Sequence, residues 1–144
     1  MSYEIVKADK SDAAEIAMLE RQYIEVAWTE SQIVESMDSG LYDFYVCKHG
    51  GKIIAYGFLQ WCLDEGNICN IATHEQFRNR GIAACILSNM VKSASERGAA
   101  RLLLEVSENN QGAISLYTKA GFEVLYKRNN YYGSVAALVM ERKI

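Results

Sequence analysis

Proline is absent from this 144-residue chain, so glycine and capping residues must mark the ends of its helices and strands. Histidine is scarce, and its two copies, at positions 49 and 74, stand far apart. The cysteines show no close pairing of the kind that binds zinc or builds a disulfide framework. We therefore expect no metal site and no disulfides. We interpret the cysteines as reduced core residues: Cys47, Cys62, Cys69 and Cys85.

Long apolar runs are also missing, and none approaches the roughly 20 residues that span a bilayer. The first ten residues mix polar and charged side chains and lack the basic-then-apolar pattern of a secretion signal. The net charge of −3 provides no sequence-wide attraction to nucleic acid or to an anionic membrane. Half of the residues are apolar, which suffices for one continuous core. We expect a single domain over residues 1–144, located in the cytoplasm.

The spacing of apolar residues predicts a chain that alternates between strands and helices. Capping-box patterns at Asp12 with Glu15, and at Thr29 with Gln32, indicate two helix starts. The expected elements are a strand over 3–8, helices over 12–23 and 29–40, strands over 44–48, 52–63 and 67–73, a helix over 81–96, a strand over 101–106, a helix over 110–120, and strands over 123–127 and 135–141. This order predicts an α/β (α+β) fold in which helices cover a largely antiparallel sheet.

Gly81 is the most informative residue, because it joins the expected strand over 67–73 to the long helix that follows. A basic, glycine-containing turn at the start of a helix presents backbone N–H groups that have no partner within the helix. The positive end of the helix dipole lies at the same place, and the two effects together favour a bound anion. Residues 78–84 are therefore predicted to bind phosphate.

Two sequence motifs accompany this turn. The first is Arg78-Asn79-Arg80-Gly81-Ile82-Ala83, which fits the pattern Arg or Gln, two residues, Gly, one residue, Gly or Ala. The second is Leu104-Glu105-Val106, followed by Asn110 and by Leu116-Tyr117-Thr118-Lys119-Ala120-Gly121-Phe122. With these motifs, and with its element order over essentially its whole length, the chain resembles the GNAT acyltransferase superfamily. The resemblance implies the acetyl-CoA-binding GNAT fold, in which about four helices flank a mixed, mostly antiparallel seven-stranded sheet.

Within that superfamily the chain is most similar to the ribosomal-protein alanine N-acetyltransferases of the RimI type. The similarity rests on short segments in the same order: Trp28-Thr29-Glu30, Leu63-Asp64-Glu65, Asn70-Ile71-Ala72 and Arg128-Asn129-Asn130-Tyr131-Tyr132. Ala27 replaces the proline that often precedes the tryptophan, and the loop after Tyr132 is short. The resemblance implies an acetyl-CoA-dependent N-acetyltransferase of a primary amine. The expected acceptor is the N-terminal α-amine of a protein such as a ribosomal protein.

The same resemblance implies how acetyl-CoA is held. The pyrophosphate is expected against the amides of the 78–84 turn, and the pantetheine arm along the strand edge, with the Ile71 amide near the thioester oxygen. The expected cofactor-binding residues are Ile71, Ala72, Thr73, Arg78, Asn79, Arg80, Gly81, Ile82, Ala83, Ala84, Asn110 and Tyr117. For Arg78 and Arg80 the alternative is a pair of solvated loop arginines, and for Gly81 it is an ordinary turn glycine.

Glu105 lies at the end of an apolar strand, where a carboxylate either turns to solvent or lines a cleft. In RimI-type enzymes the matching glutamate is the general base, and the resemblance implies this role here, either directly or through a water molecule. At pH 7 roughly a tenth of an α-amine is already neutral, compared with about 0.04% of a lysine amine. A weakly basic glutamate therefore suits an α-amine better than a lysine side chain.

Tyr117 belongs to an apolar helix stripe with Ala113, Leu116 and Ala120, so its position alone would indicate a buried structural tyrosine. Its match to the family motif implies instead that it is the catalytic proton donor. A phenol with a pKa near 10 can protonate a departing thiolate whose conjugate acid has a pKa near 8.5. Glu105 and Tyr117 are thus the two expected catalytic residues.

Four residues are candidates for the acceptor site. Tyr131 and Tyr132, in the expected last loop, either clamp the acceptor peptide or are packed or exposed loop aromatics. Trp28 is expected in the core, with a place in the acceptor-site wall as the alternative. Glu20 is expected on a solvated helix face, and the alternative is contact with the incoming ammonium group.

Other functions stay open at this point. A GNAT enzyme could accept a small amine or a lysine side chain, and a non-catalytic acetyl-CoA-binding regulatory module would belong to a different class. The presence of both Glu105 and Tyr117 argues against the module. No cysteine in the motifs is placed to form an acyl-enzyme, so direct transfer in a ternary complex is expected. The expected partners are acetyl-CoA and the amine acceptor, without nucleic acid or membrane, and the expected state is a monomer or weak dimer.

Overall fold

The computed structural model describes residues 3–144, except for the side chains of 130–132. A single seven-stranded sheet has the order β1-β2-β3-β4-β5-β7-β6, and only β4 and β5 pair in parallel. The predicted mixed, mostly antiparallel sheet with four α-helices is confirmed. The elements are β1 (Glu4–Lys7), η1 (Lys10–Asp12), α1 (Ala13–Tyr23), α2 (Glu30–Ser39), β2 (Tyr42–His49), β3 (Lys52–Cys62), β4 (Glu65–Thr73), η2 (Glu75–Phe77), α3 (Ile82–Arg97), β5 (Arg101–Ser107), α4 (Gln111–Lys119), β6 (Glu123–Tyr132) and β7 (Val135–Lys143).

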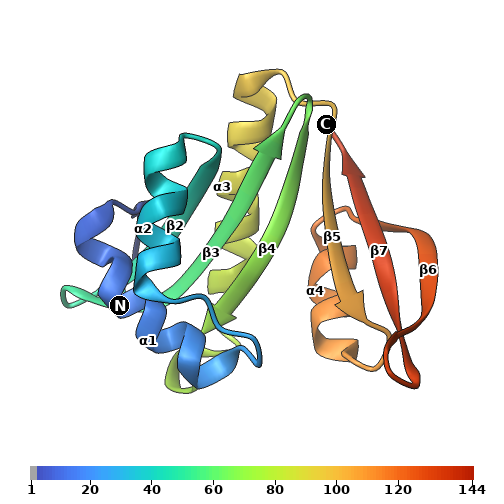
Figure 1. Cartoon of the computed structure of the whole chain (residues 1–144), viewed down its shortest axis with the longest axis horizontal. Helices are drawn as coiled ribbons and strands as arrows, with labels where there is room; N and C mark the ends of the chain where they lie inside the picture. Colours follow the sequence, from blue (N-terminus) through green and yellow to red (C-terminus); the bar gives the residue numbers. More distant parts are fainter. Residues whose placement is uncertain (1–2) are drawn as a thin grey trace.

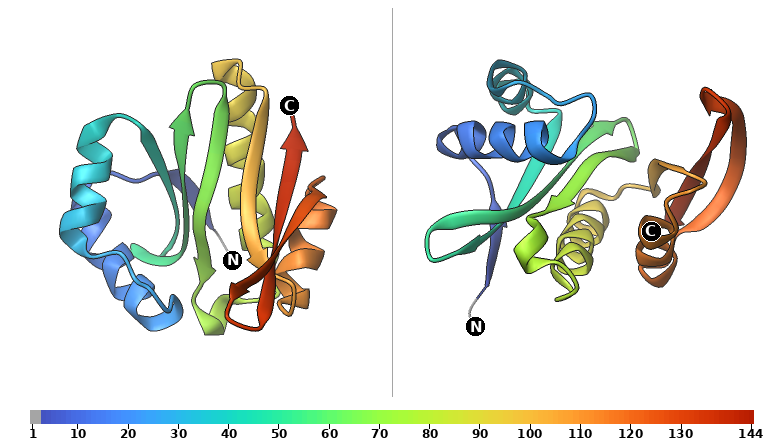
Figure 2. Two further views of the ribbon diagram at one scale, coloured as in Figure 1. Left: turned by 45° about the vertical axis from the view of Figure 1, so that its right-hand side comes forward. Right: turned by 90° about the horizontal axis from the view of Figure 1, so that it is seen from below.

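Helices cover both faces of the sheet, as Figure 2 shows from two sides. On one face α1 and α2 pack over a cluster of buried side chains that includes Ile16, Ile33 and Phe58. On the other face α3 and α4 lie over a second cluster, which includes Ile86 and Leu102. Each such aliphatic or aromatic side chain contributes about 1.5–3 kcal/mol when it is fully buried. The two clusters therefore hold the helices to the sheet.

An opening lies in the middle of the sheet, between β4 and β5. These strands pair only over residues 65–67 and 101–103. Beyond this seam they separate towards their carboxyl ends (Figure 1). Arg101 reinforces the seam, because its Nε lies 2.5 Å from Glu65 and its Nη1 lies 2.6 Å from Glu141 on β7. The sheet is thus closed at one end and open at the other.

A bulge interrupts β4 beside this opening. Asn70 lies opposite Phe58, but Ile68 lies opposite Leu59, so Cys69 is an extra residue in the ladder. As a result Cys69 and Asn70 both face α1 and α2: Cys69 packs on that cluster, and Asn70 bonds to α1. A regular strand would send consecutive side chains to opposite faces. The bulge therefore changes the direction of the strand edge immediately before residues 71–73.

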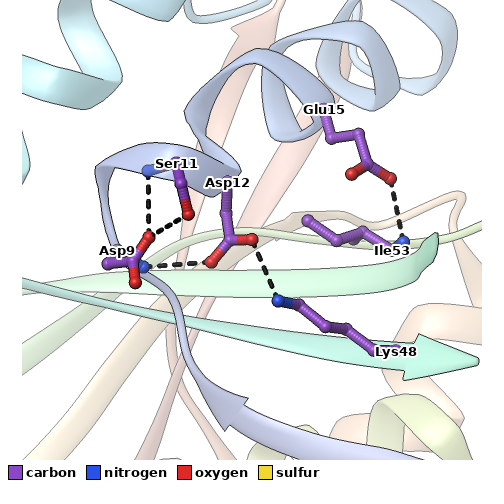
Figure 3. A network of polar contacts seen from close by, with 6 residues as sticks. All are labelled: Asp9, Ser11, Asp12, Glu15, Lys48 and Ile53. Atoms are coloured by element: carbon purple, nitrogen blue, oxygen red, sulfur yellow. Dashed lines mark hydrogen bonds and ion pairs between the residues drawn. The ribbon is translucent and has the colours of Figure 1, made fainter. Parts of the chain in front are cut away.

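The predicted start of the first helix at Asp12 is confirmed, but its capping-box partner and the end of one strand are wrong. The capping box at the first helix is formed by Asp9 and Asp12 around η1, whereas Glu15 accepts a hydrogen bond from the Ile53 N–H of β3 at 2.9 Å (Figure 3). The Glu15 side chain thus bonds to β3 instead of to the helix cap that the local pattern predicted. The strand expected over 123–127 continues to Tyr132, because β6 pairs with β7 almost to the turn. The Thr29–Gln32 box and the helix end at Gly40 are confirmed.

The expectation that all four cysteines lie in the core is also wrong. Cys47 is buried and Cys69 half-buried, but Cys62 and Cys85 are exposed. Cys62 ends β3, and Cys85 lies on the solvent side of α3, next to the buried stripe of Ile82 and Ile86. Among the described residues, no helix combines the length and apolar character needed to cross a membrane.

Candidate active site

The turn before α3 has the backbone geometry that the sequence predicted. Gly81 is the N-cap of α3 with a φ of 78°, in the left-handed region that glycine adopts at little cost. Asn79 also has a positive φ of 63°, and asparagine is the side chain type that tolerates this region best. No side chain caps the start of α3. The first N–H groups of the helix and the positive end of its dipole are thus available to an anion.

A groove of about 590 Å³ begins at this turn and runs between β4, α3 and α4. With the exception of Arg80, every residue predicted to bind the cofactor lines it. Residues that the sequence reasoning missed also line it. Its lining residues are Tyr23, Ile24, Ile71, Ala72, Thr73, Phe77, Arg78, Asn79, Gly81, Ile82, Ala83, Ala84, Asn110, Gly112, Ala113, Leu116 and Tyr117.

The two arginines of the turn behave differently. Arg78 lines the groove, and its Nε donates a hydrogen bond to the Thr73 carbonyl at 3.0 Å. Its guanidinium also lies 4.9 Å from the centre of the Tyr23 ring. Arg80 instead donates to the Tyr3 hydroxyl at 2.8 Å and to the Gln76 carbonyl at 3.3 Å. The Arg80 side chain therefore does not line the groove, and a cofactor-binding role for Arg80 stays a prediction that rests on the backbone of the turn.

Asn110 and Tyr117 enter the groove from α4. Asn110 is the N-cap of α4, and its Oδ1 accepts a hydrogen bond from the Ala113 N–H at 3.1 Å. Tyr117 lies two helical turns further on, half-buried against Phe122 in an edge-to-face contact with a ring separation of 6.0 Å. Burial raises the pKa of the Tyr117 phenol above its ordinary value of 10.0. The phenol thus keeps its proton at neutral pH.

Glu105 lines a second cavity, of about 460 Å³, on the other face of the opening. Its strand neighbours Leu104 and Val106 are buried in the α3–α4 cluster, so alternation directs Glu105 towards the α1–α2 face. The lining residues of this cavity are Asn67, Ile68, Cys69, Leu103, Leu104, Glu105, Tyr126 and Val139. Because β4 contributes to both cavities, Glu105 and Tyr117 flank a single opening in the sheet.

Glu105 is exposed and forms an ion pair with Arg128 of β6, through Oε1 and Nη1. Cys69 shares the cavity, which the sequence reasoning did not anticipate because it depends on how far β4 and β5 separate. Burial raises the pKa of the Cys69 thiol from 9.0 to about 11, and the nearby charge of Glu20 acts in the same direction. Only about one Cys69 in ten thousand is therefore a thiolate at pH 7.

The four acceptor-site candidates have different outcomes. Glu20 is fully buried, so the expected solvated face is wrong, and its oxygens are occupied by hydrogen bonds from Trp28, Tyr56 and Asn70. Trp28 is half-buried and packs edge-to-face on Phe58 with a ring separation of 4.9 Å, in line with its expected core position. The side chains of Tyr131 and Tyr132 lie outside the described residues.

Within the described part of the chain, no group of three or more His, Cys, Asp or Glu side chains could hold a metal ion. The opening brings together a carboxylate, a phenol and backbone N–H groups. A carboxylate can accept a proton from an attacking amine, and a protonated phenol can return one to a leaving group. The helix start supplies the anion-binding end of the groove.

Comparison with known proteins identifies the family of the chain. The Acetyltransferase (GNAT) family matches residues 4–122. The "[Ribosomal protein bS18]-alanine N-acetyltransferase" of Escherichia coli is 31% identical over 105 residues, covering 73% of this chain and 70% of the relative. The crystal structure of the corresponding Escherichia coli enzyme superimposes with a TM-score of 0.89 and 26% identity, covering 99% of this chain and 94% of that one. An N-alpha-acetyltransferase of Sulfurisphaera tokodaii is 28% identical over 143 residues, covering 90% and 86% of the two chains. The chain therefore belongs to the acetyltransferase (GNAT) family.

Proposed function

We propose that this N-acetyltransferase transfers the acetyl group of acetyl-CoA to the N-terminal α-amine of a protein, such as a ribosomal protein. The observation that carries the proposal is the single opening between β4 and β5. A groove that starts at an anion-binding helix end and contains Tyr117 lies on one side of it. A cavity that contains Glu105 lies on the other. Donor and acceptor can therefore meet from opposite faces of the sheet.

The groove fits a long thiol ester that carries a diphosphate. Its backbone N–H groups at the start of α3 would bind the diphosphate, and Arg78 lies beside them. The edge of residues 71–73 would run along the pantetheine arm, with the Ile71 N–H near the thioester oxygen. There it would stabilise the negative charge that develops on that oxygen during attack. Asn110 borders the same arm from α4.

In the proposed reaction the amine nitrogen attacks the thioester carbonyl carbon from the Glu105 side. The new C–N bond forms, the C–S bond breaks, and the sulfur leaves with the electron pair of that bond. Glu105 takes the proton that the amine loses, through a water molecule, and Tyr117 gives its proton to the sulfur. General acid–base steps of this kind typically contribute about 10²- to 10⁴-fold each.

Direct transfer is favoured over an acyl-enzyme. Cys69 is the cysteine that lines the Glu105 cavity, and its thiol is overwhelmingly protonated at neutral pH because its pKa is about 11. A cysteine nucleophile needs the thiolate form. The acetyl group would thus pass from sulfur to nitrogen while both substrates are bound.

The decisive experiment is a turnover assay that follows free coenzyme A with a panel of acceptors. The panel contains N-terminal peptides, including one that begins with alanine, the same peptides with a blocked α-amine and a free lysine, and polyamines, amino sugars and free amino acids. The proposal predicts turnover with free N-terminal peptides and at least a tenfold loss when the α-amine is blocked. Turnover with lysine side chains or small amines alone would replace the proposed acceptor by that class.

A different class of function is tested by the same assay. A non-catalytic acetyl-CoA-binding module would bind acetyl-CoA in calorimetry and release no coenzyme A with any acceptor. The retention of Glu105 and a protonated Tyr117 on the two sides of one opening favours the enzyme.

A further inference from the structure

Glu20 is a carboxylate inside the molecule that the reaction above does not use. It lies on α1, three residues before the helix ends, and its side chain has no exposed surface. Among the described residues, no ion pair includes Glu20. Taking a carboxylate that has no cationic partner out of water is unfavourable. Favourable interactions around the Glu20 side chain must therefore compensate this cost.

Both oxygens of Glu20 accept hydrogen bonds, and every partner is a donor. Oε1 accepts from the Trp28 backbone N–H at 2.9 Å, and Oε2 accepts from the Tyr56 hydroxyl. The Asn70 amide lies 3.1 Å from each oxygen. Burial raises the pKa of the Tyr56 phenol, and the hydrogen bond to Glu20 raises it further, so Tyr56 remains a donor. Hydrogen bonds to a charged group are stronger than those between neutral groups, and together they offset the cost of burying the carboxylate.

The three donors come from three segments around the opening. Tyr56 is on β3, and Asn70 is on β4 directly after the bulge residue Cys69. Asn70 also directly precedes residues 71–73, which line the donor groove. Trp28 lies near the end of the loop over residues 24–29, and this loop begins with Ile24, another groove residue. Through its carboxylate, Glu20 thus connects the β4 edge with the loop over residues 24–29.

The other end of α1 has its own anchors, which Figure 3 shows. Asp12 pairs with Lys48 of β2 at 3.1 Å, and Glu15 accepts from the Ile53 N–H of β3 at 2.9 Å. These contacts hold α1 to the sheet without touching β4 or the 24–29 loop. Attachment of the helix alone therefore does not account for a second, fully buried carboxylate. Glu20 differs from these anchors because its partners Trp28 and Asn70 belong to the 24–29 loop and to β4, which both contribute residues to the donor groove.

We propose that Glu20 is a positioning residue for acetyl transfer. By bonding to Asn70 and Trp28, it holds the bulged edge of β4 and the 24–29 loop at the spacing that the thioester and the incoming amine require. It acts through these residues and does not touch either substrate. The inference rests on the acetyl-transfer activity of the family and not on the identity of the acceptor.

The test compares Glu20→Gln with Glu15→Gln, the same substitution on the same helix. The Glu15→Gln side chain still has one oxygen that can accept the hydrogen bond from the Ile53 N–H. In Glu20→Gln an NH2 group replaces one of the two oxygens that accept from the Asn70 amide. One of these two hydrogen bonds is therefore lost in either orientation of the glutamine amide. The two variants therefore separate the bonding of Asn70 from the anchoring of α1.

The first readout is hydrogen–deuterium exchange on the unliganded protein, which needs no acceptor. Glu20→Gln is expected to speed exchange in peptides covering 24–29 and 67–73 at least fivefold and to leave 78–84 within twofold. The second readout is kinetic, with any acceptor that the wild type uses. Glu20→Gln is expected to lower kcat about tenfold, with the Kd of coenzyme A within about twofold. Glu15→Gln is expected to leave the 67–73 exchange and kcat within twofold.

Equal exchange in wild type and Glu20→Gln would overturn the proposal, and so would an unchanged kcat in that folded variant. Equal kcat losses in the two glutamine variants would overturn it too, since they would mean general destabilisation of α1. If Glu20→Gln does not fold, Tyr56→Phe removes one donor and introduces no new one. Tyr56→Phe is then expected to show the same exchange pattern with about a threefold loss of kcat. A folded Tyr56→Phe variant that matches wild type in both would equally reject the idea. A wild type that acetylates no α-amine changes the proposed acceptor and leaves the exchange result intact.

Discussion

Arg128 on β6 reaches across β7 to form an ion pair with Glu105 on β5. Tyr126 lies opposite Val139, which is also the partner of Glu105, so the three strands bring β6 side chains over the carboxylate. The pair holds Glu105 at the mouth of its cavity, where an amine would arrive. Exposed ion pairs contribute only about 0–1 kcal/mol to stability, so orientation is the larger expected effect of Arg128.

Glu105→Gln is expected to lower kcat about 10²- to 10³-fold, because glutamine cannot take the proton that the amine loses. The Kd of coenzyme A should stay within about twofold, since Glu105 does not line the donor groove. Arg128→Gln keeps the carboxylate and is expected to cost less than tenfold. Steady-state kinetics and calorimetry measure both effects. Wild-type turnover in Glu105→Gln would remove the proposed base.

Tyr117→Phe is expected to lower kcat about 10²-fold or more while acetyl-CoA still binds, because the departing sulfur loses its proton donor. The pKa of this phenol is raised by burial, so the protonated form persists above pH 10. In the wild type, ionisation of Tyr117 should therefore cause no marked fall in kcat between pH 7 and pH 9. A pH–rate profile measures this, and an alkaline limb below pH 9 that vanishes in Tyr117→Phe would contradict it.

Gly81→Ala tests the anion-binding turn. The added Cβ meets no atom within 4 Å, so the expected penalty comes from the φ of 78° and amounts to about 1–2 kcal/mol. We expect weaker binding of coenzyme A as the turn relaxes. Gly98→Ala is the matched control, because Gly98 has a φ of 74° and open space at the other end of α3. Equal coenzyme A affinities in the two variants would argue against the turn as the diphosphate site.

Cysteine alkylation at pH 8 tests the protonation of Cys69. Its pKa of about 11 leaves about one thiolate in a thousand at that pH. Cys62 and Cys85 are exposed, and we expect iodoacetamide to label them at least tenfold faster than Cys69. Peptide mass spectrometry over a time course gives the three rates. Labelling of Cys69 at the rate of Cys62 would reopen the acyl-enzyme route.

Glu108 is expected to make the stability of the folded protein depend on pH in the acid range. Its pKa is lowered from 4.5, first by the hydrogen bond from Lys127 and then by the Ala136 N–H. A carboxyl group with a depressed folded-state pKa stabilises the protein above its unfolded pKa, and this contribution is lost as the pH falls through the folded value. Glu108→Gln should therefore lower Tm at pH 7, and the difference should shrink below about pH 4. Thermal unfolding across that range measures it, and a difference independent of pH would contradict this origin.

The parts of the site that depend on local backbone chemistry were predictable. Gly81 and Asn110 mark helix starts by their residue type and their position before an apolar stripe, and the structure places both at N-caps. Such features are set within a few residues of the chain. Tyr117 was placed in the site by the family resemblance, because its apolar helix stripe alone indicated a buried structural tyrosine, and it does line the groove.

The features that were missed depend on partners far along the chain. Glu20 is buried only because donors from positions 28, 56 and 70 converge on it, and α1 alone cannot indicate this. Cys69 joins Glu105 in one cavity because β4 carries a bulge and separates from β5. Arg80 was assigned to the groove by its motif, but Tyr3, 77 residues earlier, accepts its hydrogen bond. Each of these outcomes depends on contacts with residues far along the chain, which no local sequence pattern indicates.

The short seam between β4 and β5 has a mechanical consequence. Glu105 and Tyr117 both belong to the carboxyl-terminal unit of β5, α4, β6 and β7, whereas β4 belongs to the larger unit beyond the seam. Three residue pairs and the Arg101 bridge join the two units across the sheet. Side chains from both units also pack in one buried cluster, which includes Ile86, Leu102 and Met140. The donor groove and the acceptor cavity therefore share β4 as a common wall, and neither site can be reshaped at that strand without affecting the other.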